Sequence, residues 1–128
     1  MPEIIISTRD LSLRAELNDS PTAQQIWDSL PIEGSINVWG DEIYFEIPVK
    51  ASQEPDARQD VEVGELGYWP DGNAFCVFFG PTPVSRINSD QPRAYSPVNI
   101  IGRMVDDAAR FRGTNQGTPV RISAAEDA

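Results

Sequence analysis

The chain has 128 residues, of which 40% are hydrophobic and 23% charged, so it can form one globular core but has no room for a second. Its 20 acidic residues outnumber 10 basic ones, and the net charge of −10 would repel nucleic-acid phosphates and anionic lipid surfaces. We therefore expect a single domain over residues 1–128 that has neither nucleic acid nor a membrane as a partner.

Histidine is absent, and Cys76 is the only cysteine. Zinc, copper, haem and iron–sulfur sites therefore lack their usual ligands, and nucleophilic catalysis lacks its usual base. We expect no metal and no cofactor. Cys76 lies within an apolar run, and the first residues lack the basic and apolar regions of a secretory signal, which together favour a cytoplasmic location.

The first third of the chain predicts a hairpin followed by a helix. Residues 4–7 and 11–17 have the alternation typical of strands. Ser20 is suited to cap a helix, Pro21 to begin it and Pro31 to end it. Its buried face recurs with helical spacing at Ala23, Ile26, Trp27 and Leu30.

The stretch SINVWGDEIYFEIP predicts a second hairpin with a definite register. A two-residue loop at Gly40 and Asp41 would pair Trp39 with Glu42 and Val38 with Ile43. The apolar residues 36, 38, 43, 45 and 47 then share one face. The opposite face carries Asn37, Trp39, Glu42, Tyr44 and Glu46.

Residues 50–60 are polar and predict a solvated loop, whereas 61–69 and 74–79 predict two strands around a turn. Because both faces of 74–79 are apolar, we expect a closed or nearly closed barrel, or a sheet with a helix over one face. The proline-rich segment 80–97 predicts a loop.

The remainder of the chain predicts a strand at 98–105, a helical turn at 106–111 and a last strand at 119–123. The expected fold is mainly β, a small barrel of about eight strands with one or two short helices. The apolar faces of 74–79 and 98–105 are also compatible with a homodimer.

The sequence GELGYWPDGNAFCVFFGPTP, residues 64–83, concentrates aromatic rings, prolines and glycines. Its glycines do not have the spacing of a phosphate-binding loop. Carboxylates are the remaining general acids and bases, and Glu42, Glu46 and Glu65 are the candidates, with a solvated strand face as the alternative for Glu42 and Glu46. Gly64 can bulge its strand, so that Glu65 becomes partly buried beside the rings, with Arg103 as a candidate partner.

Four blocks of the sequence resemble prokaryotic cyclophilin-like domain proteins, a family whose function is largely unknown. They are TAQQIWDSLP, WGDEIYFEIP, VGELGYWPDGNAFCVFFGPTP and SPVNIIGRM, in this order between Thr22 and Met104. The resemblance implies a compact cyclophilin-like β-barrel of about eight strands. It does not imply prolyl isomerase activity, because the arginine, Ser-Gln-Phe-Phe and histidine elements of true cyclophilins have no counterpart here, so no catalytic residue is assigned.

The resemblance favours a ligand site in the groove of the barrel. We expect the site to bind a cationic or neutral small molecule, or an extended peptide, between aromatic rings and carboxylates. The alternatives are rings that only cap the barrel, and a divergent prolyl isomerase or another carboxylate-dependent enzyme. The candidate ligand-binding residues are Trp39, Glu42, Tyr44, Glu65, Tyr68, Trp69, Phe79 and Thr82.

Overall fold

The computed structural model describes residues 2–125 and is mainly β. One α-helix, α1 (Pro21–Ser29), accompanies two short 3-10 helices, η1 (Pro70–Gly72) and η2 (Ala108–Phe111). The strands are β1 (Glu3–Ser7), β2 (Ser12–Leu17), β3 (Ile32–Ser35), β4 (Asn37–Val38), β5 (Glu42–Glu46), β6 (Arg58–Asp60), β7 (Glu65–Trp69), β8 (Ala74–Phe78), β9 (Arg93–Met104) and β10 (Pro119–Ala124).

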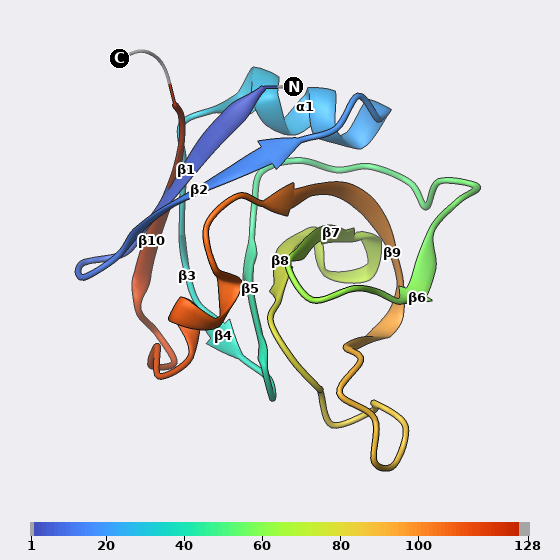
Figure 1. Cartoon of the computed structure of the whole chain (residues 1–128). Coiled ribbons are helices and arrows are strands. Elements are labelled where there is room, and N and C mark those ends of the chain that lie inside the picture. The colour runs from blue at the N-terminus through green and yellow to red at the C-terminus, as the bar shows by residue number, and fades with distance from the viewer. Residues whose placement is uncertain (1, 126–128) are drawn as a thin grey trace.

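Nine of the strands form an antiparallel sheet in the order β3-β10-β1-β2-β9-β7-β8-β5-β4, and β6 pairs with β9 beside this path. The sheet is not closed into a barrel, because its end strands β3 and β4 are not hydrogen-bonded to each other. Only Ile36 separates these two strands along the chain. The sheet curls, and its two end strands follow each other almost directly along the chain (Figure 1). The expected mainly β fold is confirmed, as a curled sheet and not as a closed barrel.

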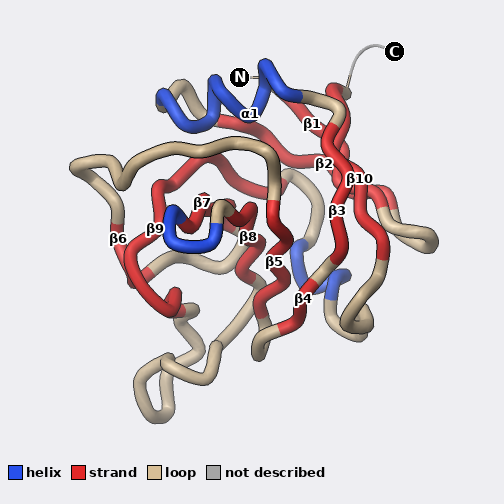
Figure 2. The backbone as a smooth tube through the Cα atoms, turned by 180° about the vertical axis from the view of Figure 1, so that it is seen from behind, coloured by secondary structure: helices blue, strands red, loops and turns tan. Residues whose placement is uncertain are grey.

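The N-terminal predictions are confirmed. β1 and β2 pair as a hairpin, with Ile4 opposite Ala15. The hydroxyl oxygen of Ser20 accepts a hydrogen bond from the Ala23 amide at 3.2 Å, which caps α1 as expected for serine at this position. Figure 2 shows α1 at one end of the molecule and the loop between β8 and β9 at the opposite end.

The register of the second hairpin is also confirmed. Asn37 pairs with Tyr44 and Val38 with Ile43, and the Trp39 amide donates to the Glu42 carbonyl at 2.9 Å. One detail differs, since Val38 is 39% exposed although its face was expected to be buried.

Three strands differ from the sequence prediction. β3 and β6 lie in segments that were not expected to be strands, and β9 begins at Arg93 inside the expected loop. All three pair with distant parts of the chain: β3 with β10, and β6 with the first half of β9. Pairing between distant segments compensates for weak local strand propensity, which local patterns do not reveal.

Strand β8 is buried on both faces, as its apolar sequence predicted. Phe75 and Val77 face the main core with residues of β1, β2, β5 and β10. Ala74, Cys76 and Phe78 face a second, smaller apolar cluster with Val98 and other residues. Val61, which follows β6, and Ala94 and Val98 of β9 complete this second cluster. Tyr44 and Trp69, two residues of the candidate site, pack against it.

Candidate functional site

The second face of the sheet has small residues below two large rings. Tyr44 of β5 pairs with Cys76 of β8, which pairs in turn with Gly67 of β7. In the adjacent row, Ala74 pairs with Trp69. Side chains of directly paired residues project to the same face of a sheet. The rings of Tyr44 and Trp69 therefore stand above a strip of small side chains, where they have room to meet edge to face.

Four rings surround one cavity on this face. Trp69 contacts Tyr44 with ring centroids 6.3 Å apart and planes at 82°, and it contacts Tyr95 at 6.0 Å and 78°. Tyr95 contacts Trp39 at 6.1 Å and 71°. The rings and Glu42 line a cavity of about 240 Å³. We call this set, Trp39, Glu42, Tyr44, Trp69 and Tyr95, the aromatic box.

Among the described residues that line the box, Glu42 carries the one carboxyl group. Only 5% of the residue is exposed, and its Oε1 atom has no hydrogen-bond partner among residues 2–125. Burial raises the pKa of Glu42 to about 8, and the Cys76 thiol opposes this shift only in part. The carboxyl is therefore mostly protonated at neutral pH, and it can gain or lose a proton close to that pH.

The Cys76 thiol is fully enclosed beside Glu42. Burial, with a further contribution from Glu42, raises the pKa of Cys76 well above its ordinary value. Since the thiolate is the reactive form of cysteine, this thiol is a packing group and not a nucleophile.

A bulge in β9 brings Tyr95 to the box. Arg58 of β6 pairs with Val98 and Asp60 pairs with Arg93, so Gln59 alone lies opposite residues 94–97. The extra residues on one strand push it outward, as in a β-bulge.

Side chains hold the bulge where backbone pairing is lost. The Gln59 Nε2 group donates to the carbonyl of Ala94 at 2.9 Å and to that of Tyr95 at 3.1 Å. Within the bulge, the Ser96 hydroxyl accepts the Trp69 indole N–H at 2.6 Å. Gln59 thus fixes the backbone of one wall, and Ser96 links the bulge to another wall.

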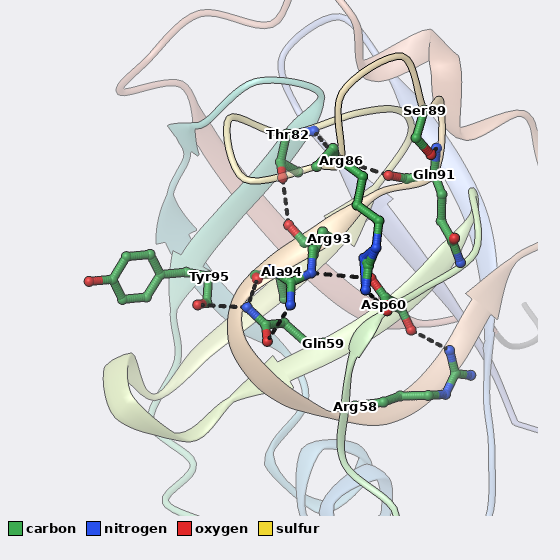
Figure 3. A network of polar contacts seen from close by, with 11 residues as sticks. Arg58, Gln59, Asp60, Thr82, Arg86, Ser89, Gln91, Arg93, Ala94 and Tyr95 are labelled. Atoms are coloured by element: carbon green, nitrogen blue, oxygen red, sulfur yellow. Dashed lines mark hydrogen bonds and ion pairs between the residues drawn. The ribbon is translucent and has the colours of Figure 1, made fainter.

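Charged residues surround Gln59 on the side away from the box. The Asp60 carboxylate pairs with Arg93 at 3.3 Å and with Arg86 at 3.4 Å, and Arg93 also donates to Gln59 Oε1 at 3.2 Å. Figure 3 shows this network to the right of Tyr95, with the Tyr95 ring pointing away from it. The residues of this network do not line the box, and through Gln59 they hold the backbone of Tyr95 in position.

Neither a cluster of metal ligands nor a helix that could cross a membrane is found within residues 2–125. No group of three or more histidine, cysteine, aspartate or glutamate residues is placed to hold a metal ion there. None of the helices in that range is long and apolar enough to cross a membrane.

Comparison with known protein families identifies the family of this chain. The family described as Cyclophilin-like matches residues 2–123, which is nearly the whole sequence. The chain belongs to the cyclophilin-like family. No curated protein matches it.

Two solved structures resemble this cyclophilin-like protein. A hypothetical protein from Archaeoglobus fulgidus is 36% identical with a TM-score of 0.80, over 97% of this chain and 95% of the other. McbB in complex with tryptophan is 20% identical with a TM-score of 0.68, over 98% of this chain but only 45% of McbB. The second likeness shows the fold alone.

The cyclophilin-like chain brings together four of the eight residues expected at the site. Trp39, Glu42, Tyr44 and Trp69 line the box. Tyr95 was not expected there, because its segment reads as a loop. Its one sequence signal is an aromatic residue between polar neighbours, and such a signal does not place it beside Trp39 and Trp69.

Glu65 lies apart from the box. It lines a separate cavity with Glu62 and Arg103, among other residues. Its carboxylate pairs with Arg58 at 2.8 Å and not with Arg103, although Arg103 is its partner across the sheet. Glu65 is partly buried and accepts hydrogen bonds, as expected, but the rings are not its neighbours in that cavity.

The other three expected residues, Tyr68, Phe79 and Thr82, do not line the box, and their contacts are with other parts of the fold. Tyr68 is fully buried in the main core, and its hydroxyl donates to the Val49 carbonyl at 2.6 Å. Phe79 is 5% exposed and lies under the Arg112 guanidinium. Thr82 donates to the Arg93 carbonyl at 2.5 Å, which ties the β8–β9 loop to the start of β9.

Proposed function

We propose that this protein binds a small organic molecule in the aromatic box. The observation that carries the proposal is the gathering of four aromatic rings and one buried carboxyl around a single cavity. Binding sites for small molecules are typically concave and apolar, with few polar groups that orient the ligand. Glu42 supplies a buried carboxyl group for this purpose.

The size of the box narrows the range of ligands. Clefts for drug-sized ligands typically measure about 300–1,000 Å³. The box, at about 240 Å³, lies below that range. It suits a small ligand, or a single side chain of an extended peptide.

A thermal-shift screen tests the proposal. The panel contains small amines, neutral aromatic compounds such as indole, proline-containing peptides, and tryptophan, which is bound in the structure of McbB. A ligand present at about 100 times its dissociation constant stabilises the folded state by about 2.7 kcal/mol, which raises the melting temperature by several degrees.

Two matched variants decide whether a hit binds in the box. Trp69→Leu removes one wall, whereas Trp27→Leu removes a tryptophan of α1 that packs against the core away from the box. Each variant is compared with its own ligand-free melting temperature. The ligand-induced shift is expected to vanish in Trp69→Leu and persist in Trp27→Leu, and a shift that both variants keep would contradict the proposal.

A second candidate function is acid–base catalysis by Glu42. Its pKa of about 8 favours this candidate, because general acids and bases work best with a pKa near the operating pH. Prolyl isomerisation is one reaction to assay. A rate above the uncatalysed one that Glu42→Gln abolishes would support catalysis, whereas the uncatalysed rate alone would remove the isomerase form of this candidate.

A further inference from the structure

The four rings of the box meet one another edge to face. Neighbouring walls meet at 71°, 78° and 82°, so each ring is turned nearly perpendicular to the next. The face of an aromatic ring has negative potential and attracts cations. The walls therefore favour a positively charged ligand over an anion.

Glu42 lacks a cation of its own. The six ion pairs among residues 2–125 use other acids, and none of them involves Glu42. Among the described residues, no lysine or arginine lines the box. A buried carboxylate without a counter-charge is costly, and burial accordingly shifts Glu42 toward its neutral form.

Asp41, which precedes Glu42 in the sequence, differs from it by having a cationic partner. Asp41 pairs with Arg112 at 2.9 Å, and the same guanidinium lies 5.5 Å from the centre of the Phe79 ring. Asp41 therefore receives its cation, with an aromatic face, from within the protein. Glu42 has four rings around its cavity and no cation.

The unpartnered Oε1 atom of Glu42 adds a directional requirement. A buried acceptor without a donor loses free energy that a ligand N–H can restore. We infer that the aromatic box takes an organic ammonium ion with at least one N–H group, which donates to Glu42 while the rings surround its alkyl substituents. This inference rests on the proposed function and names the chemical class of its ligand.

Other ligand classes meet only part of these requirements. A quaternary ammonium ion satisfies the rings but has no N–H to donate. A neutral alcohol can bond to the carboxyl but supplies no charge. An anion would face both the ring faces and the acidic surface of the protein.

Three probes of similar size separate these requirements. Trimethylammonium carries the charge and one N–H, tetramethylammonium carries the charge alone, and tert-butanol is a neutral donor. Titrations are followed by the indole N–H resonances of Trp39 and Trp69. Trimethylammonium is expected to bind at least about tenfold more tightly than either of the others, since a charge-assisted hydrogen bond contributes roughly twice what a neutral one does.

Glu42→Gln and Glu46→Gln form the matched pair of variants. Both replace one carboxyl group of β5 with an amide, but Glu42 lies in the box and Glu46 is exposed. Glu42→Gln closely resembles the protonated form that burial favours, so it should fold. It is expected to reduce trimethylammonium affinity at least about tenfold, whereas Glu46→Gln changes it less than about twofold.

The outcomes separate the inference from the proposed function. Equal binding of trimethylammonium and tetramethylammonium, or tighter binding of tert-butanol, would overturn the inference and leave binding in the box intact. An unchanged trimethylammonium affinity in Glu42→Gln would also overturn it. If no probe and no compound of the thermal-shift panel perturbs Trp39 or Trp69, the proposed function itself fails.

Discussion

Glu42 combines two properties that rarely occur together in a carboxyl group. It is almost completely buried, and its Oε1 atom has no hydrogen-bond partner within residues 2–125. Most buried carboxylates are paired or hydrogen-bonded, so an unsatisfied one calls for an explanation. Such groups gather at functional sites, where a ligand supplies the missing partner.

The raised pKa of Glu42 predicts an unusual pH dependence of stability. Its pKa is about 8 in the folded protein and 4.5 in the unfolded reference, so the folded state binds more protons between these values. Its contribution to the free energy of unfolding is complete below about pH 4.5 and is lost as the pH rises through about 8. The other titratable side chains that contact the carboxyl or line the box are those of Cys76, Tyr44 and Tyr95.

The pH dependence of stability is measured by urea denaturation of the native protein and of the Glu42→Gln variant between about pH 4.5 and 8. The free energy of unfolding of the native protein is expected to fall relative to that of the variant by up to about 1.4 kcal/mol per pH unit. Subtracting the two curves removes the contribution of acids that both proteins share. Parallel curves between about pH 5 and 8 would show that Glu42 is not held protonated.

Because the pKa of Glu42 is raised, binding of a cation in the box should release a proton from its carboxyl. Glu42 is mostly protonated at neutral pH, but it must be ionised to pair with an ammonium ion. Below about pH 8, the affinity for trimethylammonium is expected to rise by up to about tenfold per pH unit. Calorimetry in buffers of different ionisation enthalpy should detect close to one released proton, and none in Glu42→Gln.

At the scale of elements, the box depends on the pairing of β6 with β9. Gln59 is the residue of β6 opposite the bulge, and its amide replaces ladder hydrogen bonds that residues 94–97 do not make. The side chain of Gln59 does not line the box. It acts through the backbone of Tyr95, and is thus a positioning residue.

Gln59→Met tests this role, because methionine has a similar length but no N–H donor. Affinity for trimethylammonium is expected to fall about three- to tenfold, with a loss of stability of about 1 kcal/mol. In a Tyr95→Ala background, the same substitution should leave the affinity nearly unchanged, as a double-mutant cycle would show. Gln25→Met, on the exposed face of α1, is the control. Equal losses with and without the Tyr95 ring would mean that Gln59 acts by another route.

At the scale of the whole molecule, the acidic surface adds a long-range attraction for cations. The net charge of −10 extends well beyond the box, whose single carboxyl provides only local attraction. Long-range attraction is screened by salt, whereas attraction within a buried pair is screened much less.

A salt titration separates these two contributions. Between about 0.01 M and 1 M salt, the Debye length falls from about 30 Å to about 3 Å. The affinity of trimethylammonium is expected to fall severalfold over this range, and that of neutral indole to change little. Glu46→Gln should retain most of the effect, because nearly all of the acidic surface remains. A fall of the same size for indole would indicate a general effect of salt on the fold.

The sequence by itself determined the parts of the protein that depend on neighbours along the chain. Ser20 and Pro21 start α1, and the two-residue loop at Gly40 sets the register of the second hairpin. That register places Trp39, Glu42 and Tyr44 on one face, so three of the five residues of the box could be predicted from a period of two residues. The four blocks between Thr22 and Met104 also sufficed to predict the family.

Only the tertiary structure decided what completes the box. Tyr68 and Trp69 are adjacent and point to opposite faces, and pairing with β8 and β9 decides that Tyr68 enters the core and Trp69 the box. Tyr95 arrives through a bulge opposite Gln59, and Glu65 turns to Arg58 in another cavity. Local patterns specify which residues share a strand face, but the contacts that cover that face come from segments far along the chain, whose pairing leaves no periodic signal in the sequence.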